Sequence, residues 1–205
     1  MRLGSIVLAG GRSRRLGEPK EALPFLGGTL LGRAVETLLS CSAPVVVVAR
    51  DEDQELPPIP LEAEITHDAQ TGQGPLVGML AGMKTLDGRC DAAFVSSCDL
   101  PFLTEHAVGW LADQLGDHDM VLARPGGIMQ PLAAIYSLRV IAKIETLINE
   151  GILKPRALTE RVNALVLEDD ALATSGAAEQ LLHNINSQED YAAALAEAER
   201  RIGES

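Results

Sequence analysis

A short, mostly apolar run at residues 5–9 ends directly in two glycines near the start of the sequence. The run has no polar residues at alternate positions and no helical spacing, which favours a strand that is buried on both faces. We expect it to be the first strand of the protein and to lie at the centre of a sheet.

Strand and helix patterns alternate along the rest of the sequence. The predicted strands are 45–49, 63–66 and 92–96, with further candidates at 120–123, 131–136 and 164–167, and the predicted helices are 30–40, 74–85, 104–115, 137–150 and 188–200. This alternation implies an α/β fold with a mostly parallel sheet and helices on both faces, and such sheets bind ligands at the carboxyl ends of their strands. The 205 residues suit one domain that spans 1–205.

Composition argues against several classes of partner. Seventeen basic and 29 acidic residues give a net charge of −12, which opposes general binding to nucleic acids or anionic membranes, and 3% aromatic residues are too few for base-stacking platforms. No stretch approaches the ~18 apolar residues of a membrane span. The three cysteines have no C-x-x-C spacing, so neither a disulfide scaffold nor a structural zinc site is indicated. We expect a cytoplasmic protein that binds neither nucleic acid nor membranes.

A glycine-rich and basic segment follows the first predicted strand. Residues 8–20 read Leu-Ala-Gly-Gly-Arg-Ser-Arg-Arg-Leu-Gly-Glu-Pro-Lys. Glycines let backbone N–H groups approach a phosphate chain closely, and the basic side chains supply positive charge. The segment matches neither the Walker pattern nor G-x-G-x-x-G, so the ATPase and dinucleotide dehydrogenase hypotheses lose their main support. It predicts an anion-binding loop, with a solvated basic turn as the alternative.

A single carboxylate arrives at the end of another predicted strand, in Ser-Ser-Cys-Asp-Leu-Pro at 96–101. Hard divalent ions such as Mg²⁺ bind carboxylate and substrate phosphate oxygens. Asp99 is therefore a candidate magnesium ligand, although a turn or cap residue would look the same. Cys98 is expected to be a small buried residue rather than a nucleophile.

Two further segments are candidates for ligand contacts. His67 and Asp68 precede the loop Gly-Gln-Gly-Pro-Leu-Val-Gly at 72–78, where the Asp68 carboxylate and backbone amides could bind a base or ribose, or simply cap the next helix. The segment Asn-Ile-Asn-Ser-Gln-Glu-Asp at 184–190 precedes the last predicted helix, where asparagine and serine are expected as caps.

Taken together, five motifs resemble the molybdenum cofactor guanylyltransferase family. They are Leu-Ala-Gly-Gly-x-Ser-x-Arg-x-Gly-x-x-Lys at 8–20, Gly-Pro-Leu-x-Gly at 74–78, Asp-x-Pro at 99–101, Gln-Pro-Leu-x-Ala-x-Tyr at 130–136 and Asn-Ile-Asn-x-x-Glu-Asp at 184–190. The resemblance implies a single nucleotidyltransferase domain with a Rossmann-like three-layer sandwich, similar to nucleotide-diphospho-sugar transferases. It also implies the reaction of GTP with molybdopterin-bound molybdenum, which requires magnesium and releases pyrophosphate.

The resemblance assigns roles to matching positions. The expected nucleotide and cofactor contacts are Leu8, Ala9, Gly10, Gly11, Asp68, Gly74, Pro75 and Leu76, with Asn184 and Asn186 on the pterin side. Arg15 and Lys20 are expected to face the triphosphate, and Asp99 to bind Mg²⁺. The partners implied are GTP, molybdopterin, other cofactor-biosynthesis proteins and a recipient molybdoenzyme.

One departure from the family pattern leaves alternatives open. The family usually has aspartate just before the lysine, whereas this chain has Glu18-Pro19-Lys20, so only Glu18 could supply that carboxylate. A non-catalytic nucleotide or cofactor carrier is therefore one alternative. Others are a molybdopterin cytidylyltransferase and a sugar-phosphate nucleotidyltransferase, although Gly11 argues against the cytidylyl enzyme, whose relatives usually have Leu-Ala-Ala-Gly here.

The acceptor is a second polyanion that a protein of net charge −12 must bind. We expect a separate basic patch for it, and Lys154 with Arg156 is the candidate. An ordinary solvated loop after a helix is the alternative for these two residues.

Overall fold

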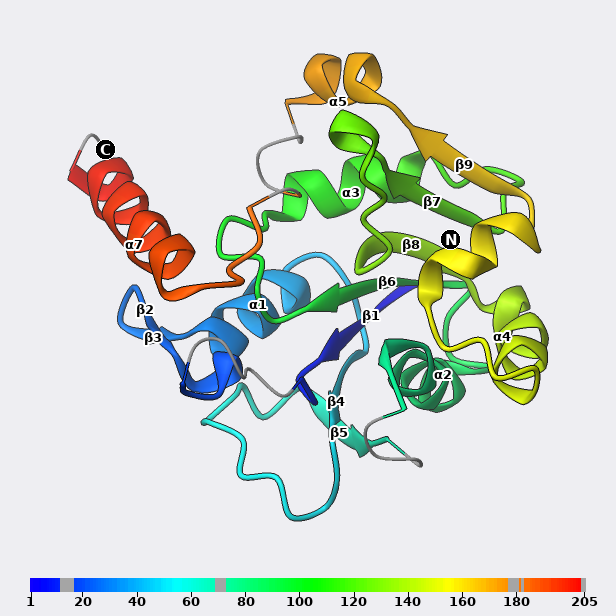
Figure 1. Cartoon of the computed structure of the whole chain (residues 1–205), viewed down its shortest axis with the longest axis horizontal. Helices are drawn as coiled ribbons and strands as arrows, with labels where there is room; N and C mark the ends of the chain where they lie inside the picture. The colour runs from blue at the N-terminus through cyan, green and yellow to red at the C-terminus, as the bar shows by residue number, and fades with distance from the viewer. Residues whose placement is uncertain (12–16, 69–72, 177–180, 182, 204–205) are drawn as a thin grey trace.

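The computed structural model describes residues 1–11, 17–68, 73–176, 181 and 183–203. Within them, one seven-stranded sheet has the order β5-β4-β1-β6-β8-β7-β9, and β2 and β3 form a separate hairpin (Figure 1). The strands are β1 (Leu3–Leu8), β2 (Pro24–Phe25), β3 (Gly28–Thr29), β4 (Val45–Ala49), β5 (Glu64–His67), β6 (Ala92–Ser97), β7 (Met120–Ala123), β8 (Ala133–Ser137) and β9 (Ala164–Leu167). The helices are α1 (Leu30–Leu39), α2 (Pro75–Leu86), α3 (Glu105–Asp113), α4 (Ile141–Asn149), α5 (Asp169–Ser175) and α7 (Gln188–Gly203).

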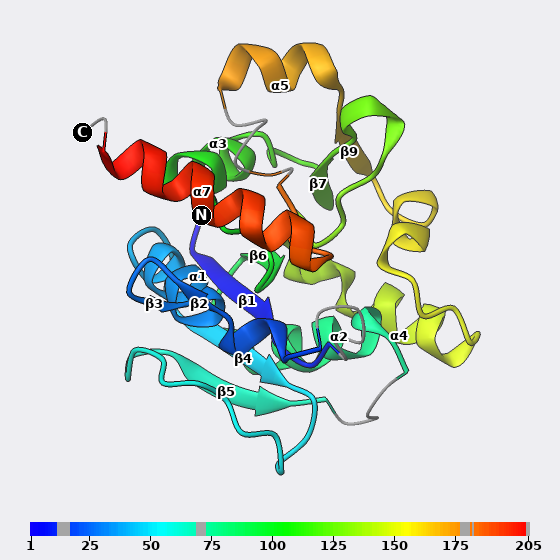
Figure 2. The ribbon, with the colours of Figure 1, turned by 60° about the vertical axis from the view of Figure 1, so that its left-hand side comes forward.

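Strand β1 is central, as its apolar run predicts. It pairs in parallel with β4 on one side and with β6 on the other. Its side chains alternate between two cores: Val7 packs in the cluster that contains α1 and α3, and Ile6 packs in the cluster that contains α2 and α4. Both side chains are fully buried. The predicted α/β sandwich of three layers, with helices on both faces of a mostly parallel sheet, is therefore confirmed (Figure 2).

Strand β8 is the exception to the parallel arrangement. It runs antiparallel to β6 and to β7. No α-helix lies between β7 and β8, only a loop with a 3-10 turn at Pro125–Gly127, so the chain returns beside β7 without the crossover that parallel neighbours need. This reversal brings the start of β8 to the edge of the sheet where the parallel strands end.

Several element boundaries differ from the predictions. The helix predicted over 137–150 is wrong at its start, because Ser137 ends β8 and its side chain caps a 3-10 turn before α4 begins at Ile141. The hairpin of β2 and β3 and the helix α5 were not predicted. Each is short, and a two-residue strand or a seven-residue helix gives no clear periodicity.

The last helix, α7, packs on the hairpin rather than on the main sheet. Its Ala194 and Ala198 are buried in a small cluster with Leu23 and Phe25. The Tyr191 hydroxyl donates a hydrogen bond to the backbone carbonyl of Pro24. Through this packing the segment that precedes α7 is held over the carboxyl ends of the central strands (Figure 1). Among the described helices, none has both the length and the apolar character that a membrane span requires.

Candidate active site

The carboxyl ends of β1, β4, β5 and β6 meet at one edge of the sheet, because these strands are parallel. Ala9 and Asp68 directly follow the ends of β1 and β5, and Asp99 lies two residues beyond the end of β6. The backbone N–H of Ala9 donates to the carbonyl of Val48, and that of Asp68 donates to Ala49, so the strand ends stay registered past the sheet itself. Three of the predicted site residues therefore lie at the edge of the sheet where ligand binding was expected.

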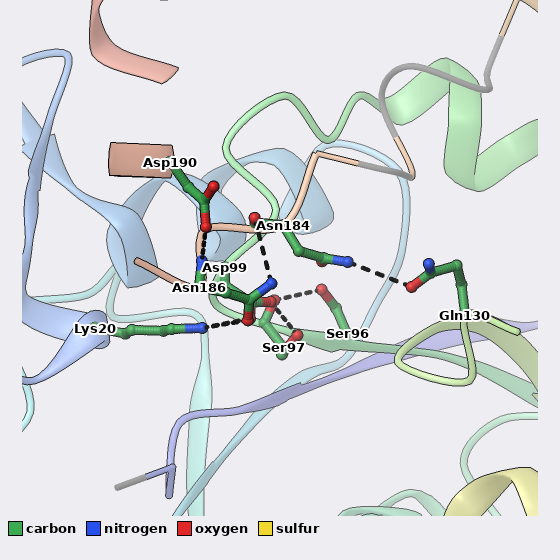
Figure 3. Close-up of polar contacts among 8 residues, drawn as sticks. All are labelled: Lys20, Ser96, Ser97, Asp99, Gln130, Asn184, Asn186 and Asp190. Atoms are coloured by element: carbon green, nitrogen blue, oxygen red, sulfur yellow. Dashed lines mark hydrogen bonds and ion pairs between the residues drawn. The ribbon is translucent and has the colours of Figure 1, made fainter. Parts of the chain in front are cut away.

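Lys20 reaches from one side into a group of polar residues at this edge (Figure 3). Its Nζ lies 2.9 Å from Oδ2 of Asp99 and donates to Oδ1 of Asn186 at 3.3 Å. The side chains of Lys20 and Asp99 are only 18% and 14% exposed, which strengthens their attraction relative to a surface pair. The structure thus joins three predicted site residues that are up to 166 positions apart in the sequence.

Asp99 is oriented by its own segment as well. The Ser97 hydroxyl donates to Oδ1 of Asp99, and the backbone N–H of Ile185 donates to the Asp99 carbonyl at 3.0 Å. The second bond ties the segment before α7 directly to the turn that follows β6. Cys98 between these residues is buried, and burial together with the neighbouring Asp99 carboxylate raises the pKa of its thiol. Cys98 is thus a buried residue, as predicted.

The segment before α7 combines capping with site contacts. The Ser187 hydroxyl accepts from the backbone N–H of Asp190 at 3.1 Å, and Asp190 Oδ2 accepts from the backbone N–H of Asn186 at 2.9 Å. The hydrogen bond from the Asn186 N–H, followed by one from the Ser187 side chain, lowers the pKa of the Asp190 carboxyl. The Asn184 side chain instead donates to Oε1 of Gln130 at 3.3 Å (Figure 3). Ser187 and Asp190 therefore make the capping hydrogen bonds of α7. The side chains of Asn184 and Asn186 instead contact Gln130 and Lys20 at the site.

Gln130 is a residue to which the sequence analysis gave no role. It precedes β8, and only the antiparallel direction of β8 places it at this edge of the sheet. Its backbone N–H bonds the carbonyl of Ala123, and its side chain holds Asn184. The motif Gln-Pro-Leu-x-Ala-x-Tyr at 130–136 was the sequence feature that could have indicated a role for Gln130.

Glycines permit two close approaches at this edge. A Cβ on Gly10 would lie 3.1 to 3.3 Å from backbone and side-chain atoms of Arg50, so a larger residue in the turn after β1 would require Arg50 to shift. Gly74 has φ of 118° and a Cβ there would lie 3.2 Å from the carbonyl oxygen of Leu153. In contrast, a Cβ on Gly11 would meet nothing within 4 Å, so packing does not require glycine there.

The start of α2 presents backbone rather than side chains. Pro75 is its first residue, where the missing N–H is no loss. Leu76 is fully buried in the core, so only its backbone could contact a ligand. Leu8 is likewise packed against the core at the end of β1. Arg15, the second predicted triphosphate ligand, lies outside the described residues.

The segment 151–160 forms one wall of a cleft of about 950 Å³. Lys154 and Arg156 line this cleft, together with Arg124 after β7 and the apolar side chains of Ile128 and Ile152. Arg124 is paired with Glu168, whereas Lys154 and Arg156 make no ion pair within the described part of the chain. The two predicted acceptor residues therefore share a concave surface.

The sequence and the fold both match known nucleotidyltransferases. Residues 5–165 match the family model described as the MobA-like NTP transferase domain. The chain is 34% identical over 189 residues to a protein of Mycobacterium bovis named "Probable molybdenum cofactor guanylyltransferase", covering 90% of this chain and 89% of the relative. It is 30% identical over 187 residues to the molybdenum cofactor guanylyltransferase of Desulfosudis oleivorans, covering 90% of each.

A solved structure shows the same fold. The molybdopterin-guanine dinucleotide biosynthesis protein A of Archaeoglobus fulgidus superimposes with a TM-score of 0.80 at 24% identity, covering 96% of this chain and 99% of that one. The resemblance found in the five motifs is confirmed by a family match over most of the chain. The protein therefore belongs to the family of MobA-like NTP transferase domains and is a nucleotidyltransferase.

Proposed function

We propose that the protein is a guanylyltransferase that transfers GMP from GTP to the molybdopterin molybdenum cofactor and releases pyrophosphate, with residues 1–205 acting as one domain. The observation that carries this proposal is the contact of Lys20 with both Asp99 and Asn186. It joins a lysine that follows the glycine-rich loop to a strand-end carboxylate and to the segment before α7. The relatives named as guanylyltransferases support the choice of both substrates.

The reaction requires positioning more than covalent chemistry. A phosphate oxygen of the acceptor attacks the α-phosphorus of GTP, and pyrophosphate leaves. The backbone of Ala9 and Gly10 and the start of α2 are suited to hold the nucleotide, since helix N-termini carry partial positive charge. Lys20 is suited to neutralise charge on the triphosphate, which is the main electrostatic task in such a transfer.

Asp99 is the residue that would hold Mg²⁺. The Lys20 ammonium contacts Asp99 Oδ2, and the other groups here are oxygens: the Ser97 hydroxyl on Asp99 Oδ1 and the Asn186 side chain on Lys20. Hard divalent ions prefer such oxygen ligands. Among the described residues no group of three or more His, Cys, Asp or Glu side chains could enclose an ion, so substrate phosphates and water would complete its coordination. When bound, the ion supplies charge neutralisation at the phosphates. A fold relative from Mycobacterium tuberculosis, of TM-score 0.58, was solved in complex with manganese.

The orientation of Lys20 favours a catalyst over a carrier. Pro19 replaces the carboxylate that the family usually has beside the lysine, but the Lys20 ammonium is held by Asp99 and Asn186. Neither of these contacts depends on a carboxylate at position 19. We therefore expect the replacement to be compatible with turnover.

The cleft lined by Lys154 and Arg156 is suited to the acceptor. Gly74 at the start of α2 packs against Leu153 in its wall, and Gln130, which holds Asn184, follows its lining residue Met129. The wall of the cleft therefore contacts the start of α2, where the nucleotide is proposed to bind. Its residue Met129 is also next to Gln130, which contacts the segment before α7. Its two cations would meet the acceptor phosphate.

Comparison of the four nucleoside triphosphates tests the proposal. GTP with Mg²⁺ should raise the melting temperature more than ATP, CTP or UTP, because Asp68 and the neighbouring loop can accept from the guanine edge. Pyrophosphate release with GTP and molybdopterin should accompany the binding. A larger shift with CTP would favour the cytidylyl enzyme, and binding without pyrophosphate release would favour the carrier.

A further inference from the structure

Gln54 lies in the loop after β4, outside every motif of the family. Its side-chain nitrogen Nε2 donates to the backbone carbonyl of Ala9 at 2.9 Å and to Oε1 of Glu21 at 2.6 Å. Its Oε1 accepts from the backbone N–H of Arg50 at 2.6 Å. One amide therefore joins the loop after β4 to the end of β1 and to the residue after Lys20.

Two of these segments carry the candidate nucleotide site. Ala9 ends β1 and begins the glycine turn, and Glu21 directly follows Lys20. The third partner, Arg50, is the residue against which Gly10 packs. Gln54 therefore holds both Ala9, at the start of the turn after β1, and Arg50, on which Gly10 of that turn packs.

The chemistry of the three partners requires a neutral amide at position 54. Glu21 and the Ala9 carbonyl both need a donor, whereas the Arg50 N–H needs an acceptor. The Glu21 residue is only 3% exposed, and a buried carboxylate without a donor is costly. A glutamate at position 54 would satisfy Arg50 alone, and an apolar residue would satisfy none of them.

We propose that Gln54 is a positioning residue for the nucleotide: it fixes the Ala9 carbonyl and, through Glu21, the turn that carries Lys20. The distance between the turn after β1 and Lys20 is then fixed before GTP binds. This lowers the entropic cost of ordering these two segments on binding. This inference rests on the proposed function, because GTP is the ligand to which the turn is matched.

Exchange of the two side chains separates a positioning role from a merely structural one. Gln54→Glu alone places two carboxylates together and should lower both the melting temperature and the affinity for GTP with Mg²⁺. Adding Glu21→Gln gives an amide that can donate to the new carboxylate, which restores the bond between positions 21 and 54. The Ala9 carbonyl still lacks its donor, so the Kd for GTP should stay raised by about tenfold while the melting temperature recovers in part.

Two controls accompany the exchange. Glu21→Gln alone keeps an acceptor for Gln54 and leaves the Ala9 bond intact, so its Kd for GTP should rise less than that of the exchange variant. Gln114→Leu removes another half-buried glutamine whose amide donates to a backbone carbonyl, that of Trp110 at the end of α3, and it should change stability without changing GTP affinity.

Calorimetric titration with GTP and Mg²⁺, well below the melting temperature of each variant, decides the question. A wild-type Kd in the exchange variant, or in Gln54→Glu, overturns the positioning role even where stability is reduced. A raised Kd in both, with a smaller rise in Glu21→Gln and a wild-type value in Gln114→Leu, supports it. If the wild-type protein itself fails to bind GTP, the proposed function fails instead.

Discussion

Asp99→Asn removes the charge of the candidate metal ligand while it keeps the size of the side chain and a hydrogen-bond acceptor for Lys20. At the observed separation of 2.9 Å, two unit charges in an effective dielectric of about 20 attract by roughly 6 kcal/mol. Desolvation of two mostly buried groups offsets most of this attraction. We expect a net loss of about 2 kcal/mol, or about 4–8 °C in melting temperature for a chain of this length.

The effect on turnover should be much larger than the effect on stability. An amide offers Mg²⁺ no charge, and loss of one preorganised electrostatic contact in an active site lowers kcat by about 100-fold or more. The assay is pyrophosphate release from GTP and molybdopterin over a series of magnesium concentrations, beside a denaturant titration of the same preparation. Rates should recover only in part at high magnesium.

Glu64→Gln is the matched control for this experiment. Glu64 pairs with Arg89 at 2.6 Å on β5, but both side chains are more than 40% exposed. Its loss should cost less than about 1 kcal/mol and leave turnover unchanged. If Asp99→Asn retains wild-type pyrophosphate release at limiting magnesium, Asp99 is a structural partner of Lys20 and the metal assignment is refuted.

Three other perturbations test separate parts of the structure. Lys154→Ala with Arg156→Ala should raise the KM for molybdopterin at least about tenfold, since each charge-assisted contact contributes roughly 1.5–3 kcal/mol, and an equal rise for GTP would contradict a separate acceptor cleft. Gly82→Ala should destabilise the fold by about 1–3 kcal/mol, because the new Cβ would lie 2.7 Å from a fully buried isoleucine of β1, whereas Gly109→Ala meets nothing within 4 Å and should stabilise α3 in a denaturant titration. Hydrogen bonds from two arginines of α7 lower the pKa of Glu197 from 4.5 to about 2, so its stabilising effect is complete above pH 4.5 and is lost as the pH falls toward 2. Glu197→Gln should make acid unfolding less steep in that window, and an unchanged acid limb would exclude the pairing.

The sequence was sufficient for the elements whose signals are local. The apolar run at β1 predicted a central strand, and Pro75 marked the start of α2, because burial on both faces and the fixed φ of proline each depend on a few adjacent residues. The seven-residue α5 and the two-residue strands of the hairpin were missed, since elements that short show no period.

For the site, too, the sequence indicated individual residues but not the contacts between them. The charges of Lys20 and Asp99 matched phosphate and metal binding independently of their neighbours in space, whereas Asn186 became a candidate only through the resemblance to the family. The contacts among these three residues, and the hydrogen bond from Gln54 to the Ala9 carbonyl, follow only from the order of strands in the sheet and from the packing of α7 on the hairpin. The sequence by itself therefore determined the fold class, the family and the kinds of side chain in the site. Tertiary structure alone decided which side chains meet, because hydrogen bonds and ion pairs act over about 3 Å and depend on chain segments that no local pattern relates.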